Sequence, residues 1–214
     1  RNGSHPIVTV LDCSKAFDTC KFNTLFAKVL EKGVPPIVVR VMMTLYEDQY
    51  AWVSWGSAKS DLFPISNGTR EGSVTSPMLW SVYCDPLIQE LRDLGVGAHI
   101  AGLFMGVTMY ADDLLLIAPT RGAMQQMLDV CEDYAQRYNI SFSTDPNPAK
   151  SKSKCIFMVG ERRNLTKPVN LMLGGTPLPW VSTAKHLGHE LHESGKMVKR
   201  AEFIDKSVEI RETF

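Results

Sequence analysis

The sequence has no excess of charge of either sign. Lysine and arginine together number 23, and aspartate and glutamate together also number 23, so the formal net charge at pH 7 is zero. Because nucleic-acid-binding domains are usually basic, this balance counts against a broadly basic binding surface. It does not exclude binding through a local cluster, and residues 150–167 hold several lysines and arginines against a single acid, Glu161.

Cysteine is scarce, and its spacing is irregular. The 5 cysteines form no Cys-x-x-Cys pair, and their number is odd. A disulfide framework or a zinc knuckle is therefore not expected, and a reducing compartment is the simpler expectation. Long apolar runs are also absent, so the sequence predicts no membrane-spanning segment, no membrane partner and no signal peptide.

Strand-like and helix-like patterns alternate along the chain. The β-branched apolar run at residues 7–11 is typical of a buried strand. Helices are expected over residues 22–32, 35–47, 76–95 and 121–138 and from residue 196 onward. Further strands are expected over residues 50–57, 62–65, 103–110, 114–118, 140–143 and 155–159, around Leu171 and at His186 and Leu187. This order predicts an α+β fold with helices packed mainly on one face of an antiparallel sheet.

Two of these strand pairs are expected to be hairpins, one turning at Ser60 and Asp61 and the other at residues 111–113. The second turn carries Asp112 and Asp113, while Asp12 ends the first strand. Carboxylates beside buried strands are costly unless their charge is compensated. A surface turn is the ordinary interpretation of an Asp-Asp pair, because aspartate suits turns.

A different interpretation follows if the first strand and the second hairpin are neighbours in the sheet. Three carboxylates would then converge at its rim, and carboxylate oxygens are ligands that Mg²⁺ prefers. Two such ions, roughly 3.5–4 Å apart, can activate an attacking oxygen and stabilise a leaving one. The pattern therefore indicates a candidate two-metal site for nucleotidyl transfer.

Five segments follow one another in a fixed order. They are residues 11–18, residues 67–72 with 76–80, Tyr110-Ala111-Asp112-Asp113, residues 150–155, and residues 186–188. They resemble the palm motifs of the reverse transcriptases of non-LTR (LINE-type) retrotransposons, from residue 7 to about residue 212. The first three motifs are specific in combination, and the last two are weak by themselves. The resemblance implies a polymerase palm that extends a DNA primer with dNTPs on an RNA template, inside the cell, with nucleus and cytoplasm both open.

The resemblance also implies roles for individual residues around the carboxylates. Asp12 and Asp112 would hold two Mg²⁺ ions, or Mn²⁺, with assistance from Asp113. The backbone carbonyl of Cys13 would be a further metal ligand. Phe17 would be a steric gate whose ring clashes with a ribose 2′-hydroxyl, although a core phenylalanine is the alternative. A ribonucleotide polymerase has no use for such a gate, so Phe17 argues against an RNA-dependent RNA polymerase.

Three further positions are implied to bind the nucleotide. Gly72 would let the backbone approach the incoming nucleotide and the template. Lys152 would lie near the triphosphate, with Lys150 and Lys154 as rivals and a solvated basic loop as the alternative. Glu71 occupies a position where the family usually has glutamine, and an ionised carboxylate can only accept hydrogen bonds. Glu71 therefore motivates a second hypothesis, a catalytically inactive palm that only binds nucleic acid or protein.

The ends of the chain look cut, and we expect a fragment of a longer retrotransposon polyprotein. Residues 1–190 are expected to form the palm, and residues 191–214 the start of a truncated, thumb-like helical region. The fingers region that precedes the first motif in the family is expected to be absent. Because positioning supplies much of the rate of phosphoryl transfer, the fragment alone is expected to polymerise poorly.

Two other groups of residues suggest functions that we consider weaker. His186, His189 and His192 have helical spacing, but they do not form a His-Glu-x-x-His motif, and a polar surface is the better expectation. Trp52, Trp55 and Trp80 are candidates for stacking on bases, but packing is the better expectation for them.

Overall fold

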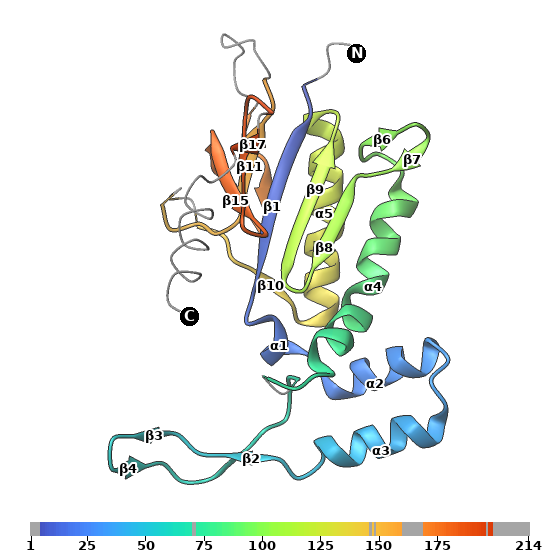
Figure 1. Ribbon diagram of the computed structural model, residues 1–214, viewed down its shortest axis with the longest axis vertical. Coiled ribbons are helices and arrows are strands. Elements are labelled where there is room, and N and C mark those ends of the chain that lie inside the picture. Colours follow the sequence, from blue (N-terminus) through green and yellow to red (C-terminus); the bar gives the residue numbers. More distant parts are fainter. Residues whose placement is uncertain are drawn as a thin grey trace, which may run out of the picture.

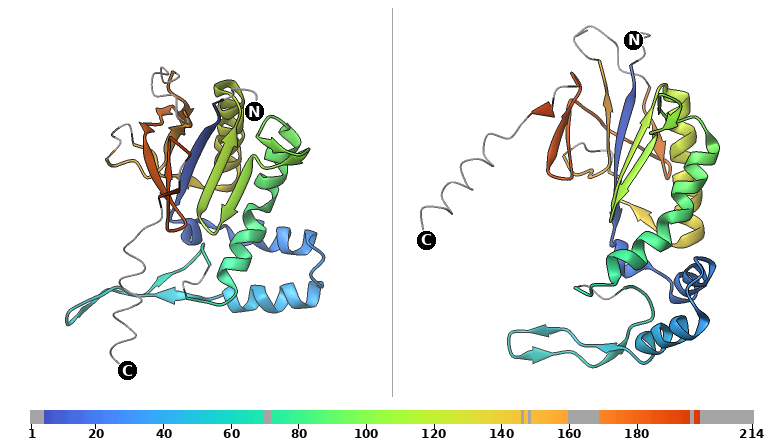
Figure 2. Two further views of the ribbon diagram at one scale, coloured as in Figure 1. Left: turned by 45° about the horizontal axis from the view of Figure 1, so that its top comes forward. Right: turned by 45° about the vertical axis from the view of Figure 1, so that its right-hand side comes forward.

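A central sheet organises the molecule, with two long helices on one face and a hairpin on the other (Figures 1 and 2). The computed structural model describes residues 5–69, 72–145, 147, 149–159, 169–195 and 197–198. A pair of helices and a long hairpin arm lie beyond one end of the sheet (Figure 1). Within these described residues, no helix combines the length and apolarity needed to cross a membrane.

The central sheet has the strand order β14-β11-β1-β9-β8, and β10 pairs with the C-terminal end of β1. Its strands are β1 (Ile7–Ser14), β8 (Val107–Tyr110), β9 (Asp113–Ala118), β10 (Ser141–Phe142), β11 (Lys154–Phe157) and β14 (Trp180–Val181). All pairings are antiparallel except that of β11 with β14, which is parallel. The expectation of an antiparallel sheet is therefore correct for all but this edge pair.

Strand β1 is covered on both faces. Ile7 and Leu11 pack in the core beneath the helices, whereas Val8 and Val10 pack in a smaller cluster with Ile156 on the opposite face. This division follows from the two-residue period of a strand. Each fully buried aliphatic side chain contributes roughly 1.5–3 kcal/mol, so both faces hold β1 in place.

The four longer helices match the sequence-based boundaries closely, whereas the sequence predicts no helix over Ala16–Thr19. The helices are α1 (Ala16–Thr19), α2 (Phe22–Glu31), α3 (Pro36–Tyr46), α4 (Ser76–Leu94) and α5 (Arg121–Tyr138). Thr120 caps α5 by accepting a hydrogen bond from the backbone of Ala123, and Gly95 ends α4 with a φ of 71°. Helices α4 and α5 cover one face of the sheet, as the sequence predicts (Figure 2).

The hairpin arm differs from the sequence-based prediction in the position of its turn. Strands β2 (Tyr50–Ala51) and β3 (Ser54–Trp55) pair with β5 (Phe63–Pro64) and β4 (Ala58–Lys59), respectively. The chain therefore turns at Gly56 and Ser57, where Gly56 has a φ of 58°, and not at Ser60 and Asp61. Ser60 lies within the arm instead, because its backbone N–H donates to Val53 and its hydroxyl accepts from the Val53 N–H.

The apolar run over residues 103–110 is also divided. Strand β6 (His99–Ile100) pairs with β7 (Leu103–Phe104) in a separate hairpin. Of the two strands in this run, β7 and β8, only β8 pairs with β9. Gly106 makes this division possible, because a Cβ there would lie 2.7 Å from the Phe104 ring and 2.8 Å from Gly97 Cα. The prediction of one strand over 103–110 is therefore wrong, whereas the hairpin around residues 111–113 is confirmed.

The C-terminal part of the described chain is built from short strands. They are β12 (Met172–Leu173), β13 (Thr176–Pro177), β15 (Thr183–His186), β16 (His189–His192) and β17 (Met197–Val198). Hairpin β15–β16 covers the sheet face opposite α4 and α5, where Ala184 packs against β1. The predicted helix from residue 196 is wrong at β17, which pairs with β16, and its remainder lies outside the described residues.

Candidate active site

Asp12 and Asp113 are directly opposed in the antiparallel pair formed by β1 and β9. Opposed residues in such a pair have Cβ atoms roughly 4.5–5.5 Å apart and point to the same face. Strand alternation places both aspartates on the face opposite α4 and α5, and both are half-buried. The structure thus brings together the carboxylates of the first and third sequence motifs, as the sequence predicts.

Asp112 lies in the tight turn between β8 and β9, next to Ala111. Ala111 has a φ of 51°, in the left-handed region that costs a residue with a Cβ roughly 1–2 kcal/mol. Two hydrogen bonds from other elements fix this turn. Cys13 N–H donates to the Asp112 carbonyl at 3.2 Å, and Trp80 Nε1–H donates to the Ala111 carbonyl at 2.8 Å.

The carboxylates carry an incompletely compensated negative charge. Burial, followed by the negative charge of Asp112, raises the pKa of Asp113 above its ordinary value; His186 partly opposes this rise, and Asp12 adds the smallest increase. Lys152 Nζ lies 3.5 Å from Asp12 Oδ2 and provides a positive charge at the site. A cation placed between the aspartates would relieve the repulsion that remains.

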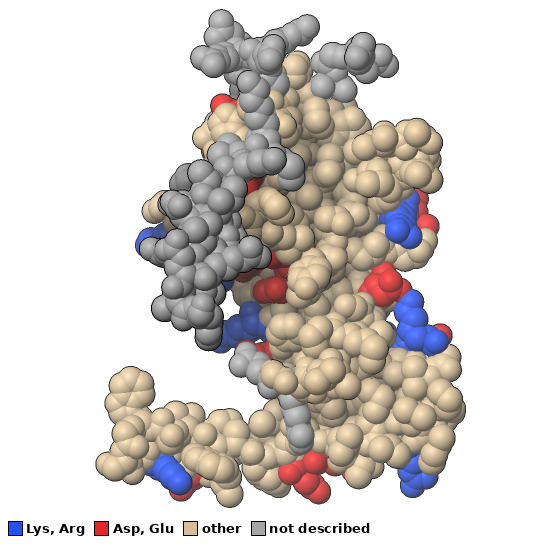
Figure 3. Space-filling model, in the orientation of Figure 1, with Lys and Arg blue, Asp and Glu red and all other residues tan. Residues whose placement is uncertain are grey.

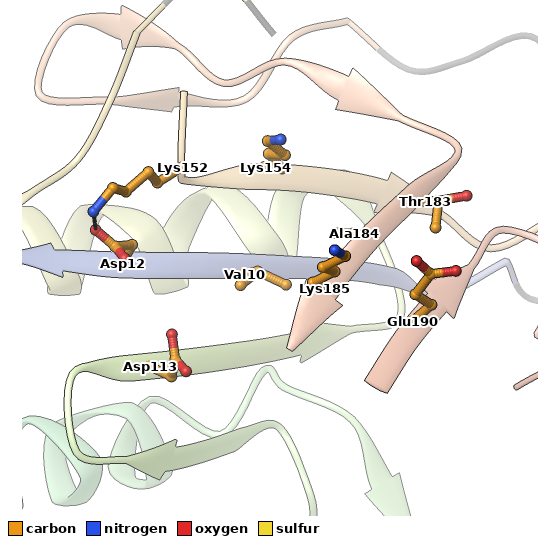
Figure 4. A pocket seen from close by; sticks show the side chains of 9 residues that line it. All are labelled: Val10, Asp12, Asp113, Lys152, Lys154, Thr183, Ala184, Lys185 and Glu190. Atoms are coloured by element: carbon orange, nitrogen blue, oxygen red, sulfur yellow. Dashed lines mark ion pairs between the residues drawn. The ribbon is translucent and has the colours of Figure 1, made fainter. Parts of the chain in front are cut away.

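A hollow of about 460 Å³ opens on this face beside the two opposed aspartates. Its lining comes from β1, β9, β11, the loop before β11 and the β15–β16 hairpin, and consists of Val10, Asp12, Asp113, Lys152, Lys154, Thr183, Ala184, Lys185 and Glu190. Figure 4 shows the Lys152 side chain reaching the Asp12 carboxylate, with Asp113 on the neighbouring strand. In the space-filling view, acidic and basic surface adjoin in the hollowed centre of the molecule (Figure 3).

The aspartates suit a metal that also takes ligands from a substrate. Over the described ranges, no three His, Cys, Asp or Glu side chains form a ready-made metal cage. Mg²⁺ is usually held by one or two carboxylates together with substrate phosphates and waters, so such a cage is not required. The opposed pair of Asp12 and Asp113, with Asp112 adjacent, therefore fits a hydrated divalent cation.

Cys13 is directed away from the carboxylates. Its side chain is buried in the core beneath the helices, and its backbone pairs with Phe142 of β10. Burial, followed by the charges of the three aspartates, raises the pKa of the Cys13 thiol well above its ordinary value. The thiol therefore stays protonated, and only the backbone carbonyl is left as the predicted metal ligand.

Phe17 lies in α1, half-buried, at the junction of the first and second motifs. Its ring meets the Trp80 ring edge-on, with 6.0 Å between centroids and 60° between planes. The second-motif loop binds the same segment, because Gly68 N–H donates to the Cys20 carbonyl and Thr69 N–H donates to the Phe17 carbonyl. The ring is thus partly packed in the core, and its role as a gate stays a prediction.

The other predicted nucleotide-binding residues have separate surroundings. Gly72 has a φ of 77° and open space beside its Cα, and Glu71 lies outside the described residues. Lys152 reaches Asp12, Lys154 lines the hollow, and Lys150 is exposed on the preceding turn. Among the three lysines, Lys152 is thus the one that forms an ion pair with a candidate metal ligand.

Three residues support the site through contacts that the sequence does not indicate. Ser153 Oγ accepts a hydrogen bond from the Asp12 backbone, and Trp80 fixes the Ala111 turn. His186 is buried near Asp113, so the expectation of a polar surface is wrong for this histidine. No sequence signal identifies these contacts, because each joins residues that are far apart in the chain.

The mixed α/β fold is consistent with that of a polymerase, and comparison with known proteins identifies the family. The family profile described as “Reverse transcriptase (RNA-dependent DNA polymerase)” matches residues 1–191. The chain belongs to the reverse transcriptase family.

Curated relatives specify the lineage. This chain is 27% identical over 135 positions to the “Retrovirus-related Pol polyprotein from type-2 retrotransposable element R2DM” of Drosophila melanogaster. The matched region covers 63% of this chain and 13% of the relative. The corresponding R2 polyprotein of Popillia japonica is 25% identical over 192 positions, covering 88% of the chain and 31% of the relative. The “RNA-directed DNA polymerase from mobile element jockey” of Drosophila melanogaster is 24% identical over 150 positions, covering 67% of the chain and 16% of the relative. The chain is a reverse transcriptase domain of the non-LTR, LINE-type lineage, and it spans less than a third of the length of these relatives.

Solved structures support the fold. Telomerase from Candida albicans, in complex with a fragment of telomeric RNA, superposes with a TM-score of 0.61 at 10% identity, covering 92% of this chain and 30% of that one. Apo telomerase from Candida tropicalis gives a TM-score of 0.60 at 14% identity, covering 92% of this chain and 36% of that one. At such identities the likeness establishes the fold alone.

Proposed function

We propose that this chain is the palm of an RNA-directed DNA polymerase, which adds dNTPs to the 3′-hydroxyl of a DNA primer on an RNA template. The observation that carries the proposal is the register of β1 and β9, which opposes Asp12 and Asp113 on an open face beside the Asp112 turn. The family of the chain supports the same reaction. The longer polypeptide, with its fingers and thumb, would hold the template and primer against this face.

Asp12, Asp112 and Asp113 are the residues that would hold two Mg²⁺ ions, with Mn²⁺ as a substitute. When bound, such ions activate the attacking hydroxyl and stabilise the leaving oxygen. The carbonyl of Cys13 is the proposed further ligand. Because the surroundings raise the pKa of Asp113, a bound cation would oppose this shift and stabilise its ionised form.

The remaining residues bind and orient the nucleotide. Lys152, which contacts Asp12, would exchange this contact for the triphosphate, where its ammonium would neutralise or protonate the pyrophosphate leaving group. The Phe17 ring would exclude a ribose 2′-hydroxyl and so favour dNTPs. Gly72, whose Cα has open space beside it, would let the backbone approach the nucleotide and template.

Primer extension by the polypeptide that carries this domain tests the proposal. Asp12→Asn and Asp112→Asn should each lower the rate by about 100-fold or more, because a preorganised electrostatic contact to the reacting groups is lost. Asp129→Asn is the matched control, since Asp129 is exposed on α5 and its replacement keeps an oxygen that can accept from Gln125. Normal extension by Asp112→Asn would refute the assignment of the site.

An inactive palm that only binds nucleic acid or protein is the second candidate, and Glu71 is the observation that favours it. In the same polypeptide, Glu71→Gln restores the residue usual in the family. A gain in dNTP incorporation would support the polymerase and identify Glu71 as a weakening substitution. Metal-independent RNA binding with no incorporation by either version would support the inactive palm.

A further inference from the structure

Trp80 joins the two parts of the candidate site. It lies in the first turns of α4, is fully buried, and stacks on Tyr83 with 6.0 Å between ring centroids. Its other contacts reach the first and third motifs: the ring meets Phe17, and Nε1–H donates to the Ala111 carbonyl at 2.8 Å. In Figure 1 the start of α4 lies next to the β8–β9 turn, which agrees with these contacts.

The Ala111 turn needs such a contact. With a φ of 51°, Ala111 adopts a backbone conformation that glycine tolerates and alanine disfavours. Its neighbour Asp112 is a proposed metal ligand, and the following residue, Asp113, faces Asp12. A turn that relaxes to a more favourable φ would move both aspartates relative to Asp12.

We infer that Trp80 is a positioning residue, which keeps the aspartate-bearing turn in its metal-binding conformation through the hydrogen bond to Ala111 and supports the Phe17 gate with the same ring. This inference rests on the proposed function, because it assigns Asp12, Asp112 and Asp113 to the metal. If the turn were free to adopt other conformations, the metal affinity would fall in proportion to the fraction of molecules that remain in the binding conformation. Trp80 is thus expected to affect metal binding without touching the metal.

Trp80→Phe removes the Nε1–H donor and keeps an aromatic ring. Mn²⁺ binding by the 214-residue chain, measured by the electron paramagnetic resonance signal of free Mn²⁺, should weaken by about three- to tenfold, the usual effect of one lost hydrogen bond.

Trp180→Phe is the matched control. Trp180 Nε1 is buried without a hydrogen-bond partner among the described residues, and its ring packs on Phe157. This variant should bind Mn²⁺ as the unchanged chain does.

A second substitution separates positioning from loss of packing. Ala111→Gly removes the strain of the left-handed residue, so adding it to Trp80→Phe should recover part of the lost Mn²⁺ affinity. It should not recover any loss of thermal stability that comes from the smaller ring at position 80. Unchanged Mn²⁺ affinity in Trp80→Phe, or a loss that Ala111→Gly leaves untouched, would overturn the inference.

Two further measurements keep the test decisive. If Trp80→Phe fails to fold, the unchanged chain is used instead, and hydrogen exchange of its indole N–H groups is measured with and without Mg²⁺. Mg²⁺ should slow exchange at Trp80 several-fold and leave exchange at Trp180 unchanged. Equal effects at both tryptophans would contradict the inference. Asp12→Asn tests the proposed function independently, since undiminished Mn²⁺ binding by this variant would refute the assignment of the metal site.

Discussion

Thr69 donates its backbone N–H to the carbonyl oxygen of Phe17 across 2.6 Å, which attaches the second-motif loop to the proposed gate. The preceding residue, Gly68, makes the close approach possible. A Cβ on Gly68 would lie 3.0 Å from both Asp18 Cα and the Phe17 carbonyl oxygen, and its φ of 95° is a conformation that other residues rarely adopt. The position of Phe17 therefore depends on the absence of a side chain at residue 68.

Gly68→Ala should displace the Phe17 segment and lower the preference for dNTPs over rNTPs. It should also reduce the free energy of unfolding by at least about 1 kcal/mol, because alanine is strained at this φ and collides with backbone atoms. Primer extension with each nucleotide and thermal unfolding measure the two effects. Gly122→Ala is the control: Gly122 lies in α5 with open space around it, so alanine there should stabilise the helix by roughly 0.5–1 kcal/mol.

Phe17→Val tests the gate directly. Removing the ring should raise rNTP incorporation relative to dNTP incorporation by about tenfold or more, the change that ~1.4 kcal/mol of lost steric repulsion would produce. Phe22→Val provides a comparison, because Phe22 is another half-buried ring but packs on Phe26 and Tyr46 at a distance from the carboxylates. An unchanged rNTP-to-dNTP ratio in Phe17→Val would leave Phe17 as a core residue only.

Lys152→Met should separate stability from catalysis. The contact with Asp12 is long and the Lys152 side chain is 68% exposed, so its loss should change the free energy of unfolding by less than about 1 kcal/mol. The maximal rate of primer extension should nevertheless fall, because the proposed partner of the leaving group is gone. Lys150→Met serves as the control from the same loop. Equal effects of the two substitutions would assign Lys152 to a solvated basic surface.

Lys28 should make stability depend on pH. It is buried in α2, where its ammonium donates to Tyr134 and lies 3.9 Å from the centre of the Tyr138 ring. Burial lowers the pKa of Lys28, so folding favours its neutral form, and stability should rise as the pH increases through the lowered pKa toward the ordinary value of 10.5. Lys28→Met should therefore be more stable than the unchanged chain at pH 7. Chemical unfolding from pH 7 to 10.5 should show that the stability advantage of Lys28→Met over the unchanged chain shrinks. A difference in the free energy of unfolding that stays constant over this range would contradict the lowered pKa of Lys28.

Local patterns determined much of this protein. The helical spacing over residues 121–138 identified α5 with its observed ends, because its periodicity and its cap both lie in adjacent sequence. The apolar run before Asp12 identified β1 for the same reason. The order of the motifs then indicated the reverse transcriptase family, and with it a site to which Asp12, Asp112 and Asp113 would all contribute.

Tertiary structure decided what depends on contacts between distant residues. The arm turns at Gly56 because Ser60 pairs with Val53, and β7 separates from β8 because Gly106 packs on Gly97 and Phe104. His186 is buried because its hairpin folds over β1 and β9, not because of its own neighbours in sequence.

Trp80 shows the same limit at the site. The sequence places Trp80 in the second motif and predicts that it packs, but only the approach of α4 to the β8–β9 turn gives its N–H the Ala111 carbonyl as a partner. Motifs in the sequence thus indicate which residues are candidates to carry the chemistry. The tertiary structure decided what holds them in place, because such support comes from packing between segments that no local pattern records.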